Sequence, residues 1–390
     1  VERSPEQMTA TAALSSCTIA PEAQVRRDSP RPPEQRNAAY AEQYDWDTLF
    51  YDVYRVGQHI VFQGPPFFNL LDPLKQSPAL RGKFRWPWRR AEHVGRDKRG
   101  EIWLREESDR ILLDSPLGRF DLEVQPNLSH LFAGRRVIHT LSKNNAVRWI
   151  VDWISFYVTE HQADGVLIYD NASTDYSAEE LQGQLRATFP GLVIQVVHWP
   201  FKYGPQGGLA GAVNGQETPW DSDFCQTGSL QHARFRFLLE ARSVLNADID
   251  ELVLSSCGRS IFAATEESRA QFIKFPGAWI CTAGPRPVSA VKCRHADFTF
   301  RDRQEREISP PKWCIIPDPR RAKRESWSVH NLFGSPHNRA LSGEFEYRHL
   351  KGISNNWKYN RWEEGTFDND RFHEDKTLSD SLVRAGLLVA

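Results

Sequence analysis

The segment Asp248-Ile249-Asp250-Glu251 carries the residue types and spacing in this 390-residue sequence that most directly suggest chemistry. It follows the apolar run that begins at Val244, so we expect it at the end of a strand. Alternate side chains of a strand point to the same face, which would bring Asp248 and Asp250 together while Ile249 turns into the core. Neighbouring carboxylates repel each other unless a cation lies between them, and Mg²⁺ and Mn²⁺ take oxygen ligands. The segment therefore predicts a site for a metal ion and a phosphate group, with a solvated acidic turn as the alternative.

A second polar group follows another apolar run, in the sequence Tyr-Asp-Asn-Ala-Ser-Thr-Asp at 169–175. Asp170 and Asn171 are expected at the carboxyl edge of a sheet, where such groups can pair with a nucleobase or a ribose. A residue from 173 to 175 could instead cap the helix that follows. Both interpretations can hold together.

The elements that must position these groups alternate between strand and helix after Arg135. The pattern predicts strands at 137–140, 166–169 and 192–197 and helices at 147–158 and 177–188. A β-α-β-α-β order predicts an α/β fold with a mainly parallel sheet flanked by helices. Ligands of such sheets bind outside the carboxyl ends of the strands, which is where both polar groups are expected.

The rest of the chain is expected to form other kinds of structure. Residues 1–40 are rich in Ser, Pro, Arg and Gln and predict a flexible surface tail. Residues 41–132 contain short apolar runs between turn residues and predict a small β-rich unit, so that 133–390 form the main domain. Within that domain we expect a loop at 204–224, a helix at 226–241, extended segments near 291–300, 312–317, 326–333 and 344–350, and a final helix at 374–387.

Taken in order, several motifs resemble those of a GT-A glycosyltransferase, with glycosyltransferase family 92 and related bacterial family 2-like enzymes as the most similar groups. The resemblance rests on Lys143-Asn144-Asn145, Trp149 to His161, Gly165, Tyr169 to Asp175, Gln226 to Arg236, Asp248 to Glu251, and the late histidines His330 and His349. It covers about 135–360 and implies a Rossmann-like GT-A fold. Asn145 departs from the pattern, because related proteins usually have Glu there.

The resemblance implies transfer of a sugar from a nucleotide sugar, a UDP-sugar, to a hydroxyl group of a glycan or other acceptor, inverting in a single displacement. Mn²⁺ or Mg²⁺ held by Asp248 and Asp250 would stabilise the leaving diphosphate. By position, Asn144, Asp170 and Asn171 would contact the base and ribose of the donor.

Late residues of the motif series are further candidates. His349 is the first choice for an additional metal ligand and His330 the second, with an ordinary hydrogen-bonded histidine as the alternative for each. Lys351 would contact the diphosphate. Arg234 could reach a phosphate or remain a solvated charge. Trp313 and Trp357 could stack on a sugar ring or belong to the core.

An inverting displacement needs a carboxylate near the acceptor hydroxyl to act as general base. Asp375, in His373-Glu374-Asp375, resembles the Glu-Asp pair that serves as base in some family 2-like enzymes. Asp297 and Glu346 are weaker candidates. The alternative for Asp375 is a capping role at the start of the final helix.

Composition excludes several other classes. With 49 Lys plus Arg and 50 Asp plus Glu, the net charge of −1 gives no field that would attract nucleic acid. No window approaches the roughly 18 apolar residues of a membrane span, and the six cysteines show no CxxC spacing. We expect a bacterial cytosolic enzyme that builds a surface or secreted glycan, with the Golgi lumen as the alternative. An inactive nucleotide-sugar or carbohydrate-binding protein and a metal-dependent phosphoryl or nucleotidyl transferase are the competing functions.

Overall fold

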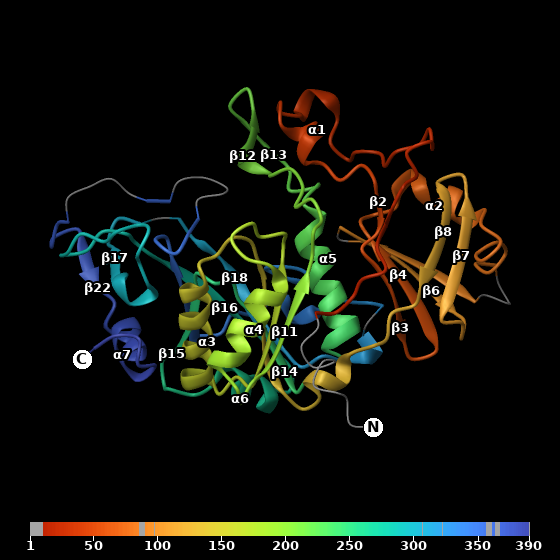
Figure 1. Ribbon diagram of the computed structural model, residues 1–390. Helices are drawn as coiled ribbons and strands as arrows, with labels where there is room; N and C mark the ends of the chain where they lie inside the picture. Colours follow the sequence, from red (N-terminus) through yellow and green to blue (C-terminus); the bar gives the residue numbers. More distant parts are fainter. Residues whose placement is uncertain are drawn as a thin grey trace.

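The computed structural model describes residues 11–389 except for short gaps at 86–89, 97, 306, 322, 356–360 and 363–366. An eight-stranded mixed sheet forms the centre of an α/β fold, and a second group of strands from the N-terminal third lies beside it (Figure 1). Its strands, in spatial order, are β11 (Val193–His198), β10 (Gly165–Asp170), β9 (Arg136–Ser142), β14 (Ser243–Asn246), β18 (Ser309–Ile315), β16 (Phe272–Ile280), β21 (Phe345–Leu350) and β15 (Glu251–Ser255).

The first four strands of this sheet are parallel, as the alternating sequence pattern predicts. The other half is mixed, because β18 runs antiparallel to both of its neighbours and β15 runs antiparallel to β21. The expected mainly parallel sheet is therefore only half of the observed one. β16, which lies between β18 and β21, and helix α6 (Ile261–Glu267) were not expected from the sequence.

Alternation along the parallel strands divides the core into two layers. On β10, Val166 and Ile168 face one layer, while Leu167 and Tyr169 face the other. The first layer contains apolar residues of α3 (Val147–His161), α4 (Ala178–Thr188), α6 and α7 (Lys376–Arg384). The second contains residues of α5 (Phe224–His232) and of the π-helical turn Ala233–Phe237 that continues it. Helices therefore cover both faces of the parallel half.

The N-terminal strands form a separate β-rich unit with its own apolar core. Its elements are β1 (Cys17–Thr18), α1 (Tyr40–Gln43), β2 (Thr48–Phe50), β3 (Asp52–Val56), β4 (His59–Gly64), α2 (Leu71–Lys75), β5 (Ala91–Arg96), β6 (Arg99–Arg105), β7 (Arg110–Ser115) and β8 (Gly118–Glu123). Four of these strands form a sheet in the order β3-β4-β6-β5. Helix α5 lies between this unit and the main sheet (Figure 1).

The described part of the expected flexible tail, residues 11–40, is bound to the rest of the molecule. Arg27 and Arg31 are 1% and 0% exposed. Arg27 donates to the carbonyl oxygens of Asp45 and Pro66, and Arg31 forms an ion pair with Asp221 at 2.7 Å. Buried guanidinium groups need such partners. The arginines that suggested a polar tail therefore attach this segment to the rest of the protein.

Shorter elements complete the chain. They are the hairpin β12 (Gly208–Val213) and β13 (Gln216–Thr218), the pair β17 (Phe300–Asp302) and β22 (Phe372–Glu374), and the pair β19 (Ser326–Trp327) and β20 (Leu332–Phe333). The hairpin lies within the segment that was expected to be an irregular loop. Within the described ranges, no helix has the length and apolar character needed to cross a lipid bilayer.

Candidate functional site

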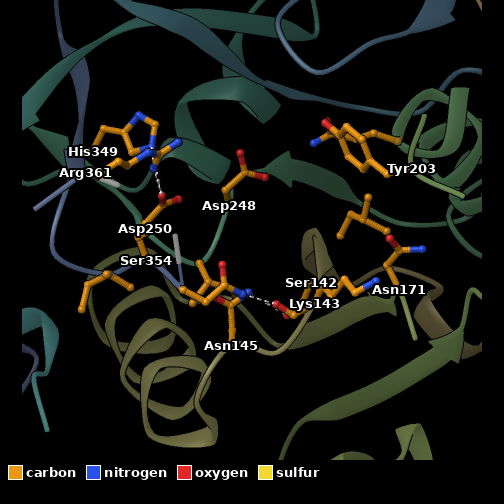
Figure 2. Close-up of a pocket in the computed structure, with 15 residues that line it drawn as sticks. Ser142, Lys143, Asn145, Asn171, Tyr203, Asp248, Asp250, His349, Ser354 and Arg361 are labelled. Atoms are coloured by element: carbon orange, nitrogen blue, oxygen red, sulfur yellow. Dashed lines mark hydrogen bonds and ion pairs between the residues drawn. The ribbon is translucent and has the colours of Figure 1, made fainter. Parts of the chain in front are cut away.

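A cleft of about 830 Å³, including the space at its mouth, lies at the carboxyl ends of β9, β10 and β14 (Figure 2). Ser142 ends β9, Asn171 follows β10, and Asp248 lies two residues beyond β14; all three line the cleft. The strand register produces this arrangement, because Asn246 of β14 is level with His139, three residues before β9 ends. The chain therefore leaves β14 before β9 ends, and the residues that follow line the cleft.

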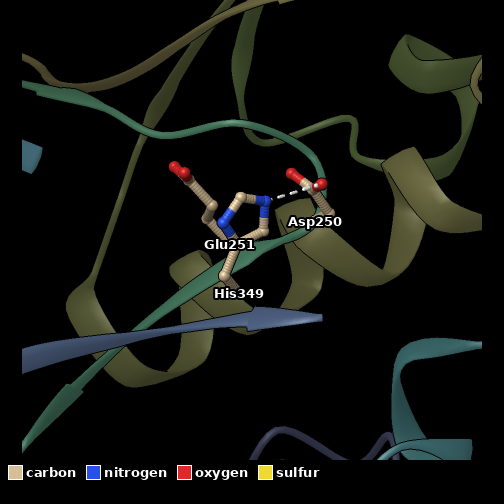
Figure 3. A group of neighbouring side chains, drawn as sticks. All are labelled: Asp250, Glu251 and His349. Atoms are coloured by element: carbon tan, nitrogen blue, oxygen red, sulfur yellow. Dashed lines mark hydrogen bonds and ion pairs between the residues drawn. The ribbon is translucent and has the colours of Figure 1, made fainter. Parts of the chain in front are cut away.

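The segment 248–251 forms the turn between β14 and β15 and places two acids of the sequence motif in the cleft. Asp248, Ile249 and Asp250 all line it. They lie in a turn and not in the alternating strand end that was expected, although Ile249, 3% exposed, also packs in the core. Glu251 starts β15, where the antiparallel register places it opposite His349 of β21. Candidate ligand atoms of Asp250, Glu251 and His349 lie within 4.8 Å of one another (Figure 3). Glu251 thus joins the candidate metal ligands next to Asp250 and His349, whereas the predicted ligand Asp248 is not in this group.

The His349 ring is held in one orientation. It stacks on Trp279 of β16 with ring centroids 4.0 Å apart, and its Nε2 lies 3.0 Å from Asp250 Oδ2. On its other side, Nδ1 lies 3.0 Å from Ser309 Oγ. Tyr347 donates its hydroxyl proton to the Pro310 carbonyl, so the bond between Tyr347 and Ser309 uses the Ser309 proton. Ser309 is then an acceptor for Nδ1–H, so Nε2 carries the lone pair whenever the ring is neutral.

A buried lysine compensates two of the acids. The Lys312 side chain is 1% exposed, and its Nζ lies 2.7 Å from Asp248 Oδ2 and 3.1 Å from Glu251 Oε2. Burial favours the neutral form of Lys312, but the two carboxylates outweigh it and raise the lysine pKa. Burial also raises the pKa of Glu251 to about 7, against the opposing effect of Lys312. The sequence contained a signal for this residue, since a lysine inside an apolar strand needs an acidic partner.

Arg361 lies against the remaining acid. Its Nη1 lies 2.7 Å from Asp250 Oδ2 and 3.2 Å from His349 Nε2, and its guanidinium lies over the Trp279 ring. Burial favours the neutral form of Asp250, but His349 and Arg361 outweigh it and lower the pKa of this carboxyl group. No sequence motif pointed to Arg361 or Trp279.

The opposite wall of the cleft carries amide and aromatic groups (Figure 2). The Asn171 amide nitrogen donates to the carbonyl oxygens of Trp199 and Phe201, both at 2.8 Å. These two bonds fix the amide and leave Oδ1 without a donor among the described residues. Tyr203 lines the same wall and donates its hydroxyl to Gln226 Oε1 at 2.9 Å. Tyr203 was not singled out from the sequence; it directly precedes the segment 204–224 that was expected to be a loop.

Two of the expected base and ribose contacts lie outside the cleft lining. The Asn144 side chain exchanges hydrogen bonds with Thr174, accepting from the Thr174 backbone at 2.7 Å. Asp170 is 1% exposed and accepts from the Ser173 hydroxyl at 2.5 Å. Burial raises the pKa of Asp170, against the effect of these hydrogen bonds. The cap of α4 is also not at 173–175 as expected but at Ser177, which forms a capping box with Glu180.

Three cationic candidates likewise do not line the cleft. Arg234 is 1% exposed, donates to the Glu325 carbonyl at 2.7 Å and lies between aromatic rings on the far face of the sheet. Lys351 forms an ion pair with Glu305 at 2.7 Å. His330 lies 3.1 Å from the Pro311 carbonyl oxygen, and burial lowers its pKa to about 3. His330 is half-buried and does not line the cleft, and its role as a metal ligand stays a prediction.

None of the three candidate bases lines the cleft in the described structure. Asp375 caps α7 by accepting from Leu378 N at 3.0 Å and forms an ion pair with Arg348. Glu346 binds the same arginine, while Asp297 is exposed and accepts from its neighbour Arg294 N. The capping alternative thus describes Asp375. Trp313 is fully buried in the core.

Trp357, the other candidate for stacking on a sugar ring, and its neighbour Lys358 lie outside the described residues.

Comparison with known proteins adds little to this geometry. No family model matches the chain, and no curated protein matches it. Among solved structures it is similar to the crystal structure of S. aureus TarS 1–349 in complex with UDP, at 13% sequence identity and a TM-score of 0.24. The similarity covers 47% of this chain and 47% of that one, about half of each. The function therefore has to be argued from the cleft itself.

Proposed function

We propose that this protein is a GT-A-type glycosyltransferase that moves a sugar from a nucleotide sugar, a UDP-sugar, to a hydroxyl group of a glycan or other acceptor. The observation that carries the proposal is the cleft at the carboxyl edge of the parallel strands. Its one wall carries acids and a histidine, and the opposite wall carries an amide and an aromatic ring. Acids and a histidine can hold a divalent cation that neutralises a diphosphate, and an amide with an aromatic ring can bind a nucleobase.

The acidic wall suits a divalent cation, which we propose to be Mn²⁺ or Mg²⁺. Asp250 offers a carboxylate oxygen and His349 offers the Nε2 lone pair, with Glu251 next to them. When bound, the ion would supply positive charge next to the departing diphosphate. Asp248 is held at the cleft by Lys312, and the aromatic stack on Trp279 keeps His349 in place. Ligands held by neighbours in this way lose little entropy on binding.

The amide wall suits uracil. Asn171 Oδ1 is an acceptor whose orientation two backbone carbonyls determine. Uracil carries a hydrogen on N3, so it can donate to this oxygen, whereas the corresponding nitrogen of cytosine is an acceptor and would be repelled. The Tyr203 ring is at the same wall and offers an aromatic face. Specificity for a uridine donor over a cytidine donor follows from this arrangement.

Inversion by a single displacement is the remaining part of the proposal. It needs a carboxylate within hydrogen-bond reach of the acceptor hydroxyl. Because Asp297, Glu346 and Asp375 lie away from the cleft lining, the proposal assigns the role to none of them. The anomeric configuration of the product, measured by NMR, tests this part separately.

The alternative is a nucleotide-sugar or carbohydrate-binding protein of the same fold that has lost catalysis. One observation favours it, because the described cleft carboxylates, Asp248 and Asp250, both already have ion-pair partners within the protein. Such a protein would bind UDP without turnover. Calorimetry with UDP, combined with a broad acceptor panel, separates the two functions.

The deciding experiment is transfer or hydrolysis of radiolabelled UDP-sugars with Mn²⁺, repeated with a chelator. We expect turnover with the ion and its loss with the chelator. Asp250→Asn should abolish turnover, while the matched control Asp109→Asn, at an exposed acid of the N-terminal unit, should not. Full turnover by Asp250→Asn would contradict the proposed role of the acidic wall.

A further inference from the structure

Two hydrogen-bond acceptors face each other at the acidic wall of the cleft. Asp250 Oδ2 and His349 Nε2 are 3.0 Å apart, and the Ser309–Tyr347–Pro310 chain of hydrogen bonds places the proton of the neutral ring on Nδ1. A carboxylate oxygen and an imidazole lone pair repel each other at this distance. Either a proton on Nε2 or a neighbouring cation relieves this repulsion.

Arg361 supplies that positive charge. Its Nη1 atom carries two hydrogens and lies 2.7 Å from Asp250 Oδ2 and 3.2 Å from His349 Nε2, so one nitrogen donates to both acceptors. The Arg361 and Asp250 side chains are 17% and 15% exposed, which makes the contact largely desolvated. Trp279 packs against both His349 and Arg361, because its ring stacks on the imidazole and lies beneath the guanidinium group.

The other nearby cation does not compete for the same atoms. Lys312 Nζ lies on Asp248 Oδ2 and Glu251 Oε2, and it is buried. Lys312 thus pairs with Asp248 and Glu251, whereas Arg361 contacts Asp250 and His349. Only the Arg361 contacts use atoms that a metal ion would need from both an acid and an imidazole.

We propose that Arg361 and a divalent cation compete for the same atoms of Asp250 and His349, so that the two cations bind there in mutual exclusion. This rests on the metal site in the proposed function. The physical reason is that Nε2 has a single lone pair, which either accepts a hydrogen bond or binds an ion. The guanidinium group must therefore leave Asp250 and His349 before the ion can bind both.

The test measures binding of Mn²⁺ alone, by electron paramagnetic resonance of the free ion, to the wild type and to Arg361→Gln. Removing the competing charge should tighten Mn²⁺ binding about tenfold, since a charge-assisted contact no longer has to be broken. Arg361→Lys, which keeps a charge, should lie between the two. Arg110→Gln is the control, because it removes one arginine that is paired with Asp121 away from the cleft.

Unchanged or weaker Mn²⁺ binding by Arg361→Gln would overturn the proposal, and so would the absence of Mn²⁺ binding in every variant. A crystal structure of the wild type with Mn²⁺ provides a second measurement that does not depend on a variant. It should show the ion on Asp250 and His349 with the guanidinium beyond hydrogen-bond distance of both. An ion bound there with Arg361 still on Asp250 would also overturn the proposal.

UDP binding in the same samples distinguishes this proposal from the proposed function. If Arg361→Gln tightens Mn²⁺ binding but neither protein binds UDP, the competition stands and the nucleotide-sugar function fails. If UDP binds in a Mn²⁺-dependent manner and the Mn²⁺ affinities are equal, the function stands and the competition fails.

Discussion

Two clusters of Asp, His and Arg in this molecule have similar composition and different surroundings. The cleft cluster consists of Asp250, His349 and Arg361. The junction cluster consists of Asp52, His232 and Arg236, where the N-terminal unit meets the main sheet. In the junction cluster, Asp52 Oδ2 lies 2.8 Å from His232 Nε2 and 2.7 Å from Arg236 Nη1.

The junction cluster has no access to solvent and no acceptor left open. Its three side chains are at most 1% exposed, and His232 Nδ1 is bonded to the Tyr169 hydroxyl at 2.7 Å. Backbone nitrogens of Ser15 and Val53 donate to the second Asp52 oxygen. An aspartate, a histidine and a hydroxyl in line suggest a catalytic relay, yet no substrate can reach them.

The difference shows that residue types alone do not mark a functional site. In the junction cluster every strong partner is satisfied within the protein, so it stabilises the contact between two units. In the cleft cluster, Arg361 contacts both Asp250 and His349 at the wall of the cleft, and both side chains of that ion pair are partly exposed. Access and exchangeable partners are therefore what separate a candidate site from a structural network.

The largest expected effect is on activity in the cleft cluster. Asp250→Asn should lower turnover of the UDP-sugar by about 1,000-fold, because it removes the carboxylate that the proposed ion needs. Its melting temperature should stay close to that of the wild type. Steady-state kinetics and calorimetric melting of the same preparation check both parts. A variant that instead unfolds would place Asp250 with the structural networks.

The next largest effect is on stability in the junction cluster. Asp52→Asn should lower the free energy of unfolding by about 3 kcal/mol, because it leaves Arg236 and its neighbours without their buried counter-charge. Urea denaturation measures this change. Specific activity per folded molecule should not change. Loss of activity in a fully folded Asp52→Asn protein would contradict the structural role of the cluster.

Lys312→Met tests the boundary between the two kinds of cluster, since Lys312 is buried but serves acids at the cleft. The substitution should lower the free energy of unfolding by about 2 kcal/mol at pH 8, because Asp248 and Glu251 lose their cation. The cost should be smaller at pH 5. The pKa of Glu251 is raised to about 7 in the folded protein, so the group is protonated there at pH 5 and no longer needs the lysine. Denaturation at the two pH values checks the sign, and an equal cost at both would be the contrary result.

The smallest expected effect concerns an acid that the motif resemblance placed in catalysis. Asp375→Ala should lower the free energy of unfolding by about 1.5 kcal/mol through loss of the cap on α7 and of the ion pair with Arg348, which keeps Glu346 as a partner. Turnover should remain, because Asp375 does not line the cleft. A loss of turnover with unchanged affinity for the donor would instead restore Asp375 as the general base.

The parallel half of the fold could be predicted from the sequence, because its strands are buried on both faces and its helices are amphipathic. The runs at 137–140, 166–169 and 192–197 lie within β9, β10 and β11, apart from one residue at the start of the last. The other half could not. Strand β16 is missing from the expectation because Phe272–Ile280 contains Lys274, Pro276 and Gly277, which interrupt a simple apolar run.

Strand ends predicted part of the site, since Asp170 ends β10 at the expected edge but does not line the cleft, whereas His349 from the motif series does. Asp248, Asp250 and Asn171 line the cleft because each follows a strand whose carboxyl end was expected at the same edge. Arg234, Asn144 and Lys351 were chosen by position in a motif series, and they lie outside the lining. Position in a series does not specify the direction of a side chain.

The sequence by itself therefore determined that acids and amides gather at one edge of a parallel sheet, since alternation and strand order are local properties of the chain. Only the tertiary structure decided which of these acids have an ion-pair partner that a ligand could replace. Lys312, Trp279 and Arg361 reach the acids from β18, β16 and a segment after β21, through strand pairings between residues far apart in the sequence. Whether a carboxylate is paired depends on those long-range contacts, and no local pattern encodes them.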